Sequence, residues 1–327
     1  MPVHRHRVVW IDVARGIAAI AVVYDHAIYL LLPDYGASLF WRHLFFAVPW
    51  FIFLFGLTSV LSIRQTPSKG PSTILRYWQK RAGLFVWYIA ASLIAEAVGR
   101  QSLPAILHDL LTFSASAPYY FFFLLLQYVF LFPFLYMFVK NRSYGAGIAL
   151  AALSVWLSLW SAKFTRDPYI TVPYRTVYGG WFGSIFTAGI LYGVFERELK
   201  KIIPAAAVVL TVVLEWKFVA TPFSAYVFGL LPWYTYGLGL PLLFTAKLVI
   251  DAASKWVSLA PVAFIGRRSM FIFLFHFLFL QLLPVSYMQS WGILLTGIIV
   301  IVLSCIAQEA VTAGRTVIVW AVRNVRT

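Results

Sequence analysis

The sequence is poor in charge and almost free of cysteine. Charged residues make up 11% of the 327 residues, against about 25% in a typical soluble domain. The single cysteine, Cys305, excludes an intramolecular disulfide and any metal site built from several cysteines. The apolar runs also lack the alternation of apolar and polar residues that marks a transmembrane β-strand. These absences exclude a disulfide scaffold and a β-barrel, and they argue against a soluble domain.

Acidic residues are scarce as well. The chain has 11 Asp and Glu against 26 Lys and Arg, which gives a formal net charge of +15. In a soluble protein this excess would suggest nucleic-acid binding. Here the basic residues gather between apolar runs, so membrane topology explains them and no nucleic-acid partner is expected.

Hydrophobic residues are abundant, at 62% of the chain, and they repeatedly form runs of 18 residues or longer. Such runs are typical of membrane-spanning helices. We therefore predict an all-α membrane helix bundle of about ten transmembrane helices, as a single domain over residues 1–327 with no separate soluble domain. The expected segments are roughly 9–32, 41–63, 82–98, 118–139, 146–162, 181–195, 202–216, 225–246, 268–283 and 291–313.

The distribution of positive charge gives this bundle a direction. With the N-terminus in the cytoplasm, 19 of the 26 Lys and Arg residues fall in cytoplasmic segments, six fall outside, and Arg15 lies within the membrane. Because cytoplasmic loops carry such an excess, both termini are predicted to be cytoplasmic. A cleavable signal peptide is not expected, since the first apolar run holds charges and no small-residue cleavage site follows it.

The first apolar segment, WIDVARGIAAIAVVYDHAIYLLL (10–32), contains the ionisable residues Asp12, Arg15, Asp25 and His26. Charge inside a membrane is costly and commonly marks a functional site. At about 100° per residue, the helix turns about 1100° between Arg15 and His26, which places both on one face about 16 Å apart. Asp12 precedes Arg15 by three residues and can pair with it.

These residue types suit a group-transfer site. Arginine recognises phosphate or carboxylate, and histidine suits general-base chemistry because it titrates near neutrality. Asp25, about a quarter turn from His26, can orient a neighbouring group, and Gly16 leaves room for a ligand or another backbone. The same pattern is also consistent with an Asp–Arg pair that locks helices together and a histidine that only packs.

Arg15 and His26, with ten residues between them, match the arginine–ten–histidine signature in the first helix of the acyltransferase-3 family, which the chain resembles. The resemblance extends over residues 7 to about 283. It departs at Phe55, where the family commonly has serine, and at Leu126, where an acidic residue is frequent. The later stretches that resemble the family are VPWFIFLFGLTSVLS (48–62), ILRYWQKRAGLFVWY (74–88), YYFFFLLLQYVFLFPFL (119–135) and FIGRRSMFIFLFHFLFL (264–280).

The resemblance implies an integral-membrane enzyme that moves an acyl group, usually acetyl, from cytoplasmic acyl-CoA to a hydroxyl of a sugar, polysaccharide or glycolipid of the cell envelope. It also implies the inner (plasma) membrane of a bacterium, and no metal is expected. The residues expected to bind the acyl-CoA donor are Arg15, Asp12 and Gly16 in the first helix and Arg76 and Arg81 at the entry to the third.

His26 and its neighbour Asp25 are the expected catalytic residues. If the helix enters the bilayer near Val8, His26 lies about 27 Å along it, near the outer face of a core about 30 Å thick. There it would take the proton of an acceptor hydroxyl as the oxygen attacks the thioester. A transient acyl-histidine is the other route, and both stay open.

Contacts with the substrate are expected from two later helices and one outer loop. The helices provide Gln127, Tyr128, Ser269 and His276, and the loop (163–181) provides Arg166 and Arg175. His276 is placed to polarise a carbonyl or carry a proton, although packing explains it equally well. The aromatic residues of the loop suit stacking on sugar rings, but they are also typical of an interfacial aromatic belt.

The alternative is a transporter or a lipid- or glycan-binding membrane bundle without acyl-transfer chemistry. A transporter would also place buried charges at broken helices, and it predicts an internal repeat that the sequence does not show. Other membrane O-acyltransferases and the heparan N-acetyltransferase type also use an intramembrane histidine. A first-helix histidine at this spacing from an arginine favours acyltransferase-3.

Overall fold

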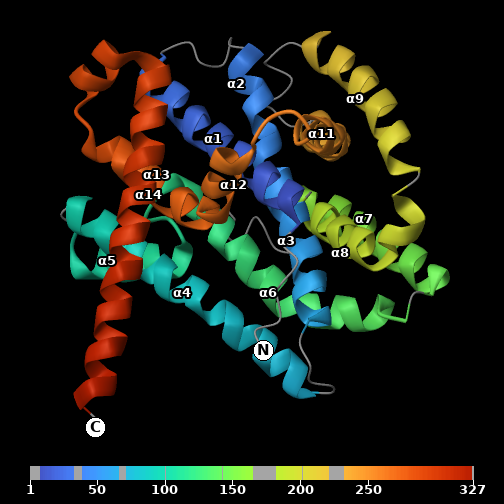
Figure 1. Cartoon of the computed structure of the whole chain (residues 1–327), viewed down its shortest axis with the longest axis horizontal. Coiled ribbons are helices and arrows are strands. Elements are labelled where there is room, and N and C mark those ends of the chain that lie inside the picture. The colour runs from blue at the N-terminus through green and yellow to red at the C-terminus, as the bar shows by residue number, and fades with distance from the viewer. Residues whose placement is uncertain are drawn as a thin grey trace. The chain divides into compact units, whose positions relative to one another are not determined.

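The structure is a computed structural model that describes residues 8–32, 39–65, 71–99, 101–141, 143–164, 182–200, 202–220 and 232–325. Within these ranges the chain is helical and has no β-strand, which confirms the predicted all-α fold (Figure 1). The helices form two compact units. Unit 1 combines Met1–Leu44 with Ser258–Thr327, and unit 2 comprises Phe45–Val257.

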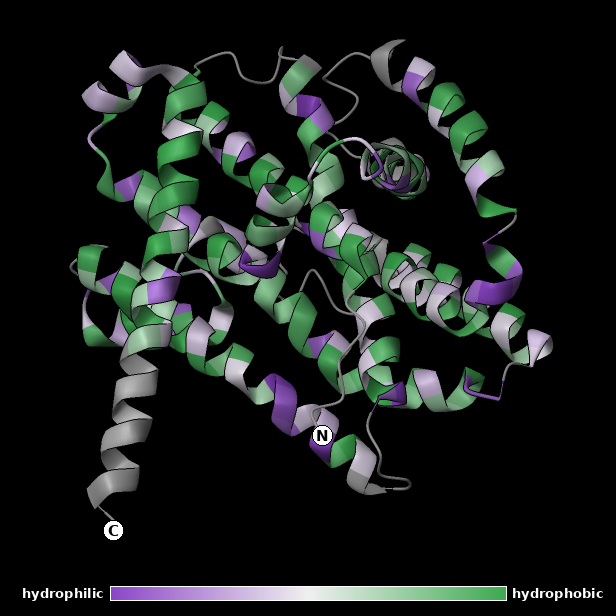
Figure 2. Cartoon of the chain, in the orientation of Figure 1, coloured by the Kyte–Doolittle hydropathy of each residue, from purple (hydrophilic) through white to green (hydrophobic). Residues whose placement is uncertain are grey.

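Many of these helices have the length and composition of membrane spans. Among the described residues, five helices are long and apolar enough to cross a membrane, or six if the bent pair α12–α13 counts as one span. Figure 2 shows hydrophobic residues along much of the length of most helices, as expected where a helix faces lipid or a core. Each of the ten predicted segments overlaps a helix. Their number as spans and the cytoplasmic placement of both ends stay predictions.

Unit 1 is organised around α1, which packs against α12, α13 and α14. α14 is broken at Gly292, whose φ of 72° and ψ of 171° lie in a region essentially reserved for glycine. Just after this break, the Tyr24 hydroxyl donates to the Leu294 carbonyl at 2.9 Å, which fastens α14 to α1. The described helices of the unit are α1 (Val9–Leu31), α2 (Leu39–His43), α12 (Ala260–Arg267), α13 (Ser269–Leu282) and α14 (Val285–Val325).

Unit 2 is organised around α3, the most buried of the candidate spans. A Cβ on Gly189 would lie 2.2 Å from the Phe53 carbonyl oxygen, so α8 and α3 approach at backbone distance, as small residues allow in membranes. The Trp50 indole donates to the Gly239 carbonyl at 2.8 Å and ties α3 to α11. The described helices are α3 (Ala47–Arg64), α4 (Pro71–Gly99), α5 (Leu103–Thr112), α6 (Tyr120–Val139), α7 (Tyr144–Phe164), α8 (Phe182–Leu199), α9 (Ile203–Ala220) and α11 (Pro232–Ala253), with the 3₁₀ turns η2 (Leu44–Phe46) and η3 (Ala117–Tyr119).

The C-terminal end of α3 supports a kink in α8. Phe195 has a non-helical backbone there, which disturbs the regular hydrogen bonding of the carbonyls around it. The Arg64 guanidinium donates to the Gly193 carbonyl at 2.8 Å and to the Val194 carbonyl at 3.3 Å. One side chain thereby satisfies two acceptors at the break.

Three helical elements differ from the sequence predictions. α4 begins at Pro71, well before the expected residue 82, because the basic residues of its first turns hide the helix from a search for apolar runs. α5 occupies an expected loop, and α12 precedes the expected segment 268–283. Both helices are too short to stand out in a search based on the length of a membrane span.

Candidate active site

The charged face of the first helix lies on α1, in unit 1. α1 is continuous from Val9 to Leu31, and a continuous helix places Arg15 and His26 on one face with about 16 Å of rise between them. Arg15 is half-buried. His26 keeps 20% of its side chain exposed, and the neighbouring Asp25 keeps 23%. The imidazole is therefore held in the unit but is still accessible.

A second histidine, His276 of α13, lies against His26. Nε2 of His276 is 3.1 Å from Nδ1 of His26, and the ring centroids are 4.9 Å apart. His276 is wholly buried, whereas His26 is not. The structure thus brings together two residues of the predicted site that are 250 positions apart in the sequence.

Each imidazole is also held by its own helix. Nδ1 of His26 is 3.0 Å from the Val22 carbonyl oxygen, one turn earlier on α1. Nδ1 of His276 is 3.0 Å from the Ile272 carbonyl oxygen and 2.9 Å from that of Phe273. These contacts fix the two rings relative to one another before any substrate is considered.

Asp25 lies on the other side of His26. Its Oδ2 is 3.8 Å from Nδ1 of His26, which is too long for a hydrogen bond but close enough for an ionised Asp25 to act on the imidazole through its charge. The side chain of Trp41, from α2, lies beside the Asp25 carboxyl. The sequence did not single out Trp41, because nothing in the spacing of α2 connects it with α1.

At the other end of α1, the contacts are between backbones. A Cβ on Gly16 would lie 2.1 Å from the Val262 carbonyl oxygen, and a Cβ on Gly266 would lie 1.7 Å from that of Asp12. α1 and α12 are therefore in direct contact there. Gly16 therefore allows another backbone to approach, which is one of the two roles predicted for it. Binding of the acyl-CoA donor by Gly16 and Asp12 stays a prediction.

Ser269 opens α13 and is buried. It follows the elbow at which α12 and α13 meet with a bend of 76°. It lies seven positions before His276, which places both on the same face of α13 about 10 Å apart. Contact between Ser269 and a substrate stays a prediction.

The two other predicted donor-binding residues belong to unit 2. Arg76 is exposed on α4. The Arg81 guanidinium lies 5.0 Å from the ring centroid of Phe55 and 5.5 Å from that of Tyr77, a cation–π arrangement. Phe55, one of the two departures from the family pattern, therefore forms part of the surface that holds Arg81. Phosphate binding by the two arginines stays a prediction.

The α6 residues predicted to contact the substrate also lie in unit 2. Tyr128 is wholly buried and stacks on Phe186 with ring centroids 4.3 Å apart. The Gln127 amide donates to the Phe123 carbonyl on its own helix at 3.4 Å. Both residues contribute to helix packing, and their contact with substrate stays a prediction.

The remaining predicted residues, Arg166 and Arg175, lie outside the described residues. Across the described ranges, no group of three or more His, Cys, Asp or Glu residues is arranged to hold a metal ion. The residues that the structure brings together are thus the two histidines and Asp25, all in unit 1 and all on α1 or α13.

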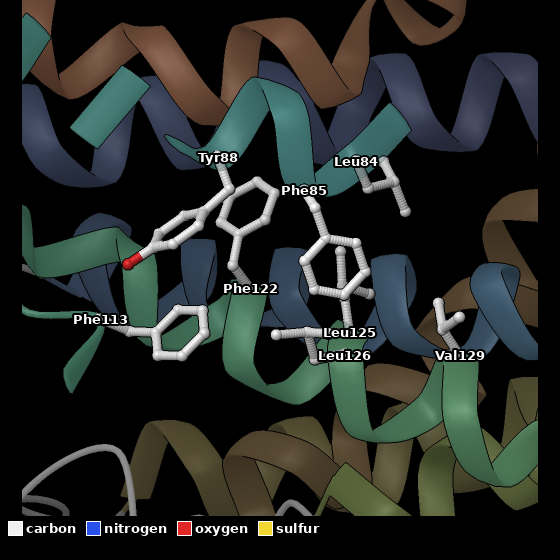
Figure 3. A pocket seen from close by; sticks show the side chains of 8 residues that line it. All are labelled: Leu84, Phe85, Tyr88, Phe113, Phe122, Leu125, Leu126 and Val129. Atoms are coloured by element: carbon white, nitrogen blue, oxygen red, sulfur yellow. The ribbon is translucent and has the colours of Figure 1, made fainter. Parts of the chain in front are cut away.

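Unit 2 contains an apolar pocket of about 250 Å³, including its open mouth. Figure 3 shows the rings of Tyr88, Phe113 and Phe122 gathered at one end of it. None of its lining residues was among the predicted site residues, and none carries a group suited to acid–base chemistry except the Tyr88 hydroxyl, which donates to the Leu110 carbonyl at 2.9 Å. The lining residues are Leu84, Phe85, Tyr88, Phe113, Phe122, Leu125, Leu126 and Val129.

One of three comparisons with known proteins gives a match. The family model of the acyltransferase domain, acyltransferase-3, matches residues 8–308 and covers most of both units. A search of the curated proteins and a search of the solved structures each returned no match. The family match and the several apolar helices make the chain a multi-pass membrane acyltransferase. By the extent of this match, the chain belongs to the acyltransferase-3 family.

Proposed function

We propose that this membrane enzyme transfers an acyl group, most simply acetyl, from cytoplasmic acyl-CoA to a hydroxyl of a sugar, polysaccharide or glycolipid outside the cytoplasm. The setting that fits is the inner membrane of a bacterium. One observation carries the proposal: within the acyltransferase match, His26 is accessible on one side and has a buried histidine against its Nδ1 on the other. An accessible imidazole backed by a fixed partner is suited to act as a general base.

The proposed reaction moves one proton and one acyl group. His26 accepts the proton of the acceptor hydroxyl while the oxygen forms a bond to the thioester carbon. The carbon–sulfur bond then breaks, and the coenzyme A thiolate takes the proton back from the imidazolium. An ester and a free thiol result, and the histidine returns to its neutral state. An acyl-histidine route would form the nitrogen–carbon bond first and release the thiolate before the hydroxyl attacks.

The donor is proposed to extend along the charged face of α1. Arg15 lies about 16 Å from His26 along the helix, and its guanidinium suits a phosphate of coenzyme A. The pantetheine arm is a linear chain that joins that phosphate region to the thioester. His26 lies 17 residues after Val9, about 26 Å along the helix, so the acceptor would approach from the opposite face of the membrane.

The test is acyl-CoA turnover by the purified full-length chain in lipid nanodiscs. Thiol release from acetyl-CoA is followed with and without methyl glucoside as a hydroxyl acceptor, and mass spectrometry detects the ester. His26→Gln should lower transfer about 10²- to 10⁴-fold, the usual contribution of a general base. His108→Gln is the matched control, because that histidine is 70% exposed on α5, and it should leave turnover unchanged. Full activity in His26→Gln would remove His26 from the mechanism, and a wild-type protein that binds acetyl-CoA without releasing thiol would favour a transport or binding function.

A further inference from the structure

The two nitrogens of His276 have different surroundings, and these determine where its proton lies. Nδ1 is within 3.0 Å of two backbone carbonyl oxygens, those of Ile272 and Phe273. Carbonyl oxygens only accept hydrogen bonds, so Nδ1 must carry a hydrogen. Because a neutral imidazole has one N–H, Nε2 of neutral His276 is then an acceptor with a free lone pair.

The neutral form of His276 is the one that fits its position. The side chain is wholly buried, and Phe273 and Phe277 lie against its ring. If His276 were an imidazolium, its Nε2–H would have to donate a hydrogen bond to Nδ1 of His26. Nδ1 of His26 would then have to be the acceptor, without a hydrogen of its own. Nδ1 of His26, however, also lies 3.0 Å from the Val22 carbonyl oxygen, and two acceptors at that distance would repel one another.

The assignment that satisfies every contact therefore gives His26 its hydrogen on Nδ1. That N–H is shared between the Val22 carbonyl and Nε2 of His276, in a three-centre hydrogen bond. The lone pair of His26 is consequently on Nε2. Within the described part of the chain, no hydrogen-bond partner is found for that nitrogen.

We infer that His276 is a positioning residue that holds His26 in the Nδ1–H tautomer, so that Nε2 of His26 is the nitrogen that reacts. This inference rests on the proposed function and specifies which atom performs it. His276 acts as the hydrogen-bond acceptor behind the base, the place that a carboxylate takes in a Ser–His–Asp triad. When Nε2 takes a proton, the Nδ1–H bond to His276 stabilises the positive charge, and so does Asp25 at 3.8 Å when it is ionised.

Substitutions at His276 separate this role from packing. His276→Leu keeps a similar volume but removes the acceptor, and His276→Gln offers an amide oxygen close to the place of Nε2. We expect His276→Leu to lower kcat on the order of 10²-fold with little change in the KM for acetyl-CoA, and His276→Gln to recover at least tenfold of that loss. Phe275→Leu, which alters the packing of the same helix, should retain kcat. Equal kcat values in the wild type and His276→Leu would overturn the inference.

A spectroscopic measurement tests the tautomer without any turnover. The chain has six histidines, so ¹⁵N-histidine labelling gives a small set of ring signals, and the signal missing in His26→Gln belongs to His26. Wild-type His26 should show a protonated Nδ1 and an unprotonated Nε2 at neutral pH, and His276→Leu should shift the ring toward a mixture of tautomers. A protonated Nε2 in the wild type would overturn the inference even if no His276 variant folds.

The two experiments also separate this inference from the proposed function. If the wild type releases no thiol from acetyl-CoA, the proposed function fails. If His26→Gln retains full turnover, acyl transfer stands but the role of His26 fails, and the role of His276 fails with it. If His26 is required but His276→Leu keeps both kcat and the tautomer of His26, only the role of His276 fails.

Discussion

Gly266→Ala tests the close contact on which the site depends. Gly266 is in α12, and a Cβ there would lie 1.7 Å from the Asp12 carbonyl oxygen and 2.8 Å from the Gly16 nitrogen. Both atoms belong to the backbone of α1. Neither can move away as the end of a side chain would, so α12 must shift as a whole.

The required shift follows from these distances. Real Cβ contacts are essentially never shorter than 3.0 Å, so α12 has to withdraw from α1 by more than 1 Å at Gly266. Overpacking of this kind typically costs about 1–3 kcal/mol. Only Arg268 separates α12 from α13, so the shift is passed on to His276. Its 3.1 Å contact with His26 would then exceed hydrogen-bond distance.

Gly83→Ala provides the matched control. Gly83 is also within a helix, and no atom lies within 4 Å of its expected Cβ, so alanine there should stabilise the helix slightly. Thermal unfolding in detergent and acetyl-CoA turnover are measured for both variants. Gly266→Ala should lower the Tm and cut turnover more than tenfold, while Gly83→Ala should retain both. A Gly266→Ala protein with wild-type Tm and turnover would refute both the close contact of α12 with α1 and the idea that a shift of α12 displaces His276.

Two further predictions concern polar contacts in unit 2. Arg64→Met should lower the free energy of unfolding by about 1–2 kcal/mol, because two carbonyls at the kink of α8 lose their donors, and chemical denaturation in mixed micelles would measure it. A hydrogen bond from His108, and a second one from Ser114, hold the pKa of Asp109 below its ordinary value. The ionised carboxylate therefore stabilises the folded chain, and this stability is lost as the pH falls through the pKa of Asp109 in the folded state. Ser114→Ala should raise that pKa, and ¹³C NMR of labelled aspartate should show the change; an unaltered titration would contradict the role of the Ser114 hydroxyl.

The sequence predicts the first helix and the family of the chain well. The expected segment 9–32 agrees with α1 (Val9–Leu31) because a long apolar run has few alternatives to a helix in a membrane. The family resemblance through Arg15 and His26 is confirmed by a match over residues 8–308. Both conclusions depend on short-range spacing, which a single sequence contains in full.

The partner of His26 could not be predicted in the same way. His276 lies in a stretch that resembles the family, but its contact with His26 joins positions 250 residues apart, and helical periodicity says nothing about such a pair. The bend between α12 and α13 and the break at Gly292 were missed for a related reason. They depend on backbone conformation and on the packing of α1, which hydropathy does not encode.

The geometry at His26 depends on two contacts between α1 and the bent pair α12–α13. One is the backbone approach of Asp12 and Gly266, and the other is the pair of histidines. Along α1 these points are 14 residues, or about 21 Å, apart, while ten helical residues from Gly266 to His276 would span only about 15 Å. The two imidazole side chains have to cover the difference, so the 76° elbow decides whether they meet. The arginine–ten–histidine spacing can therefore point to His26 as the proposed base, but the choice that we infer between its two nitrogens depends on three helices together.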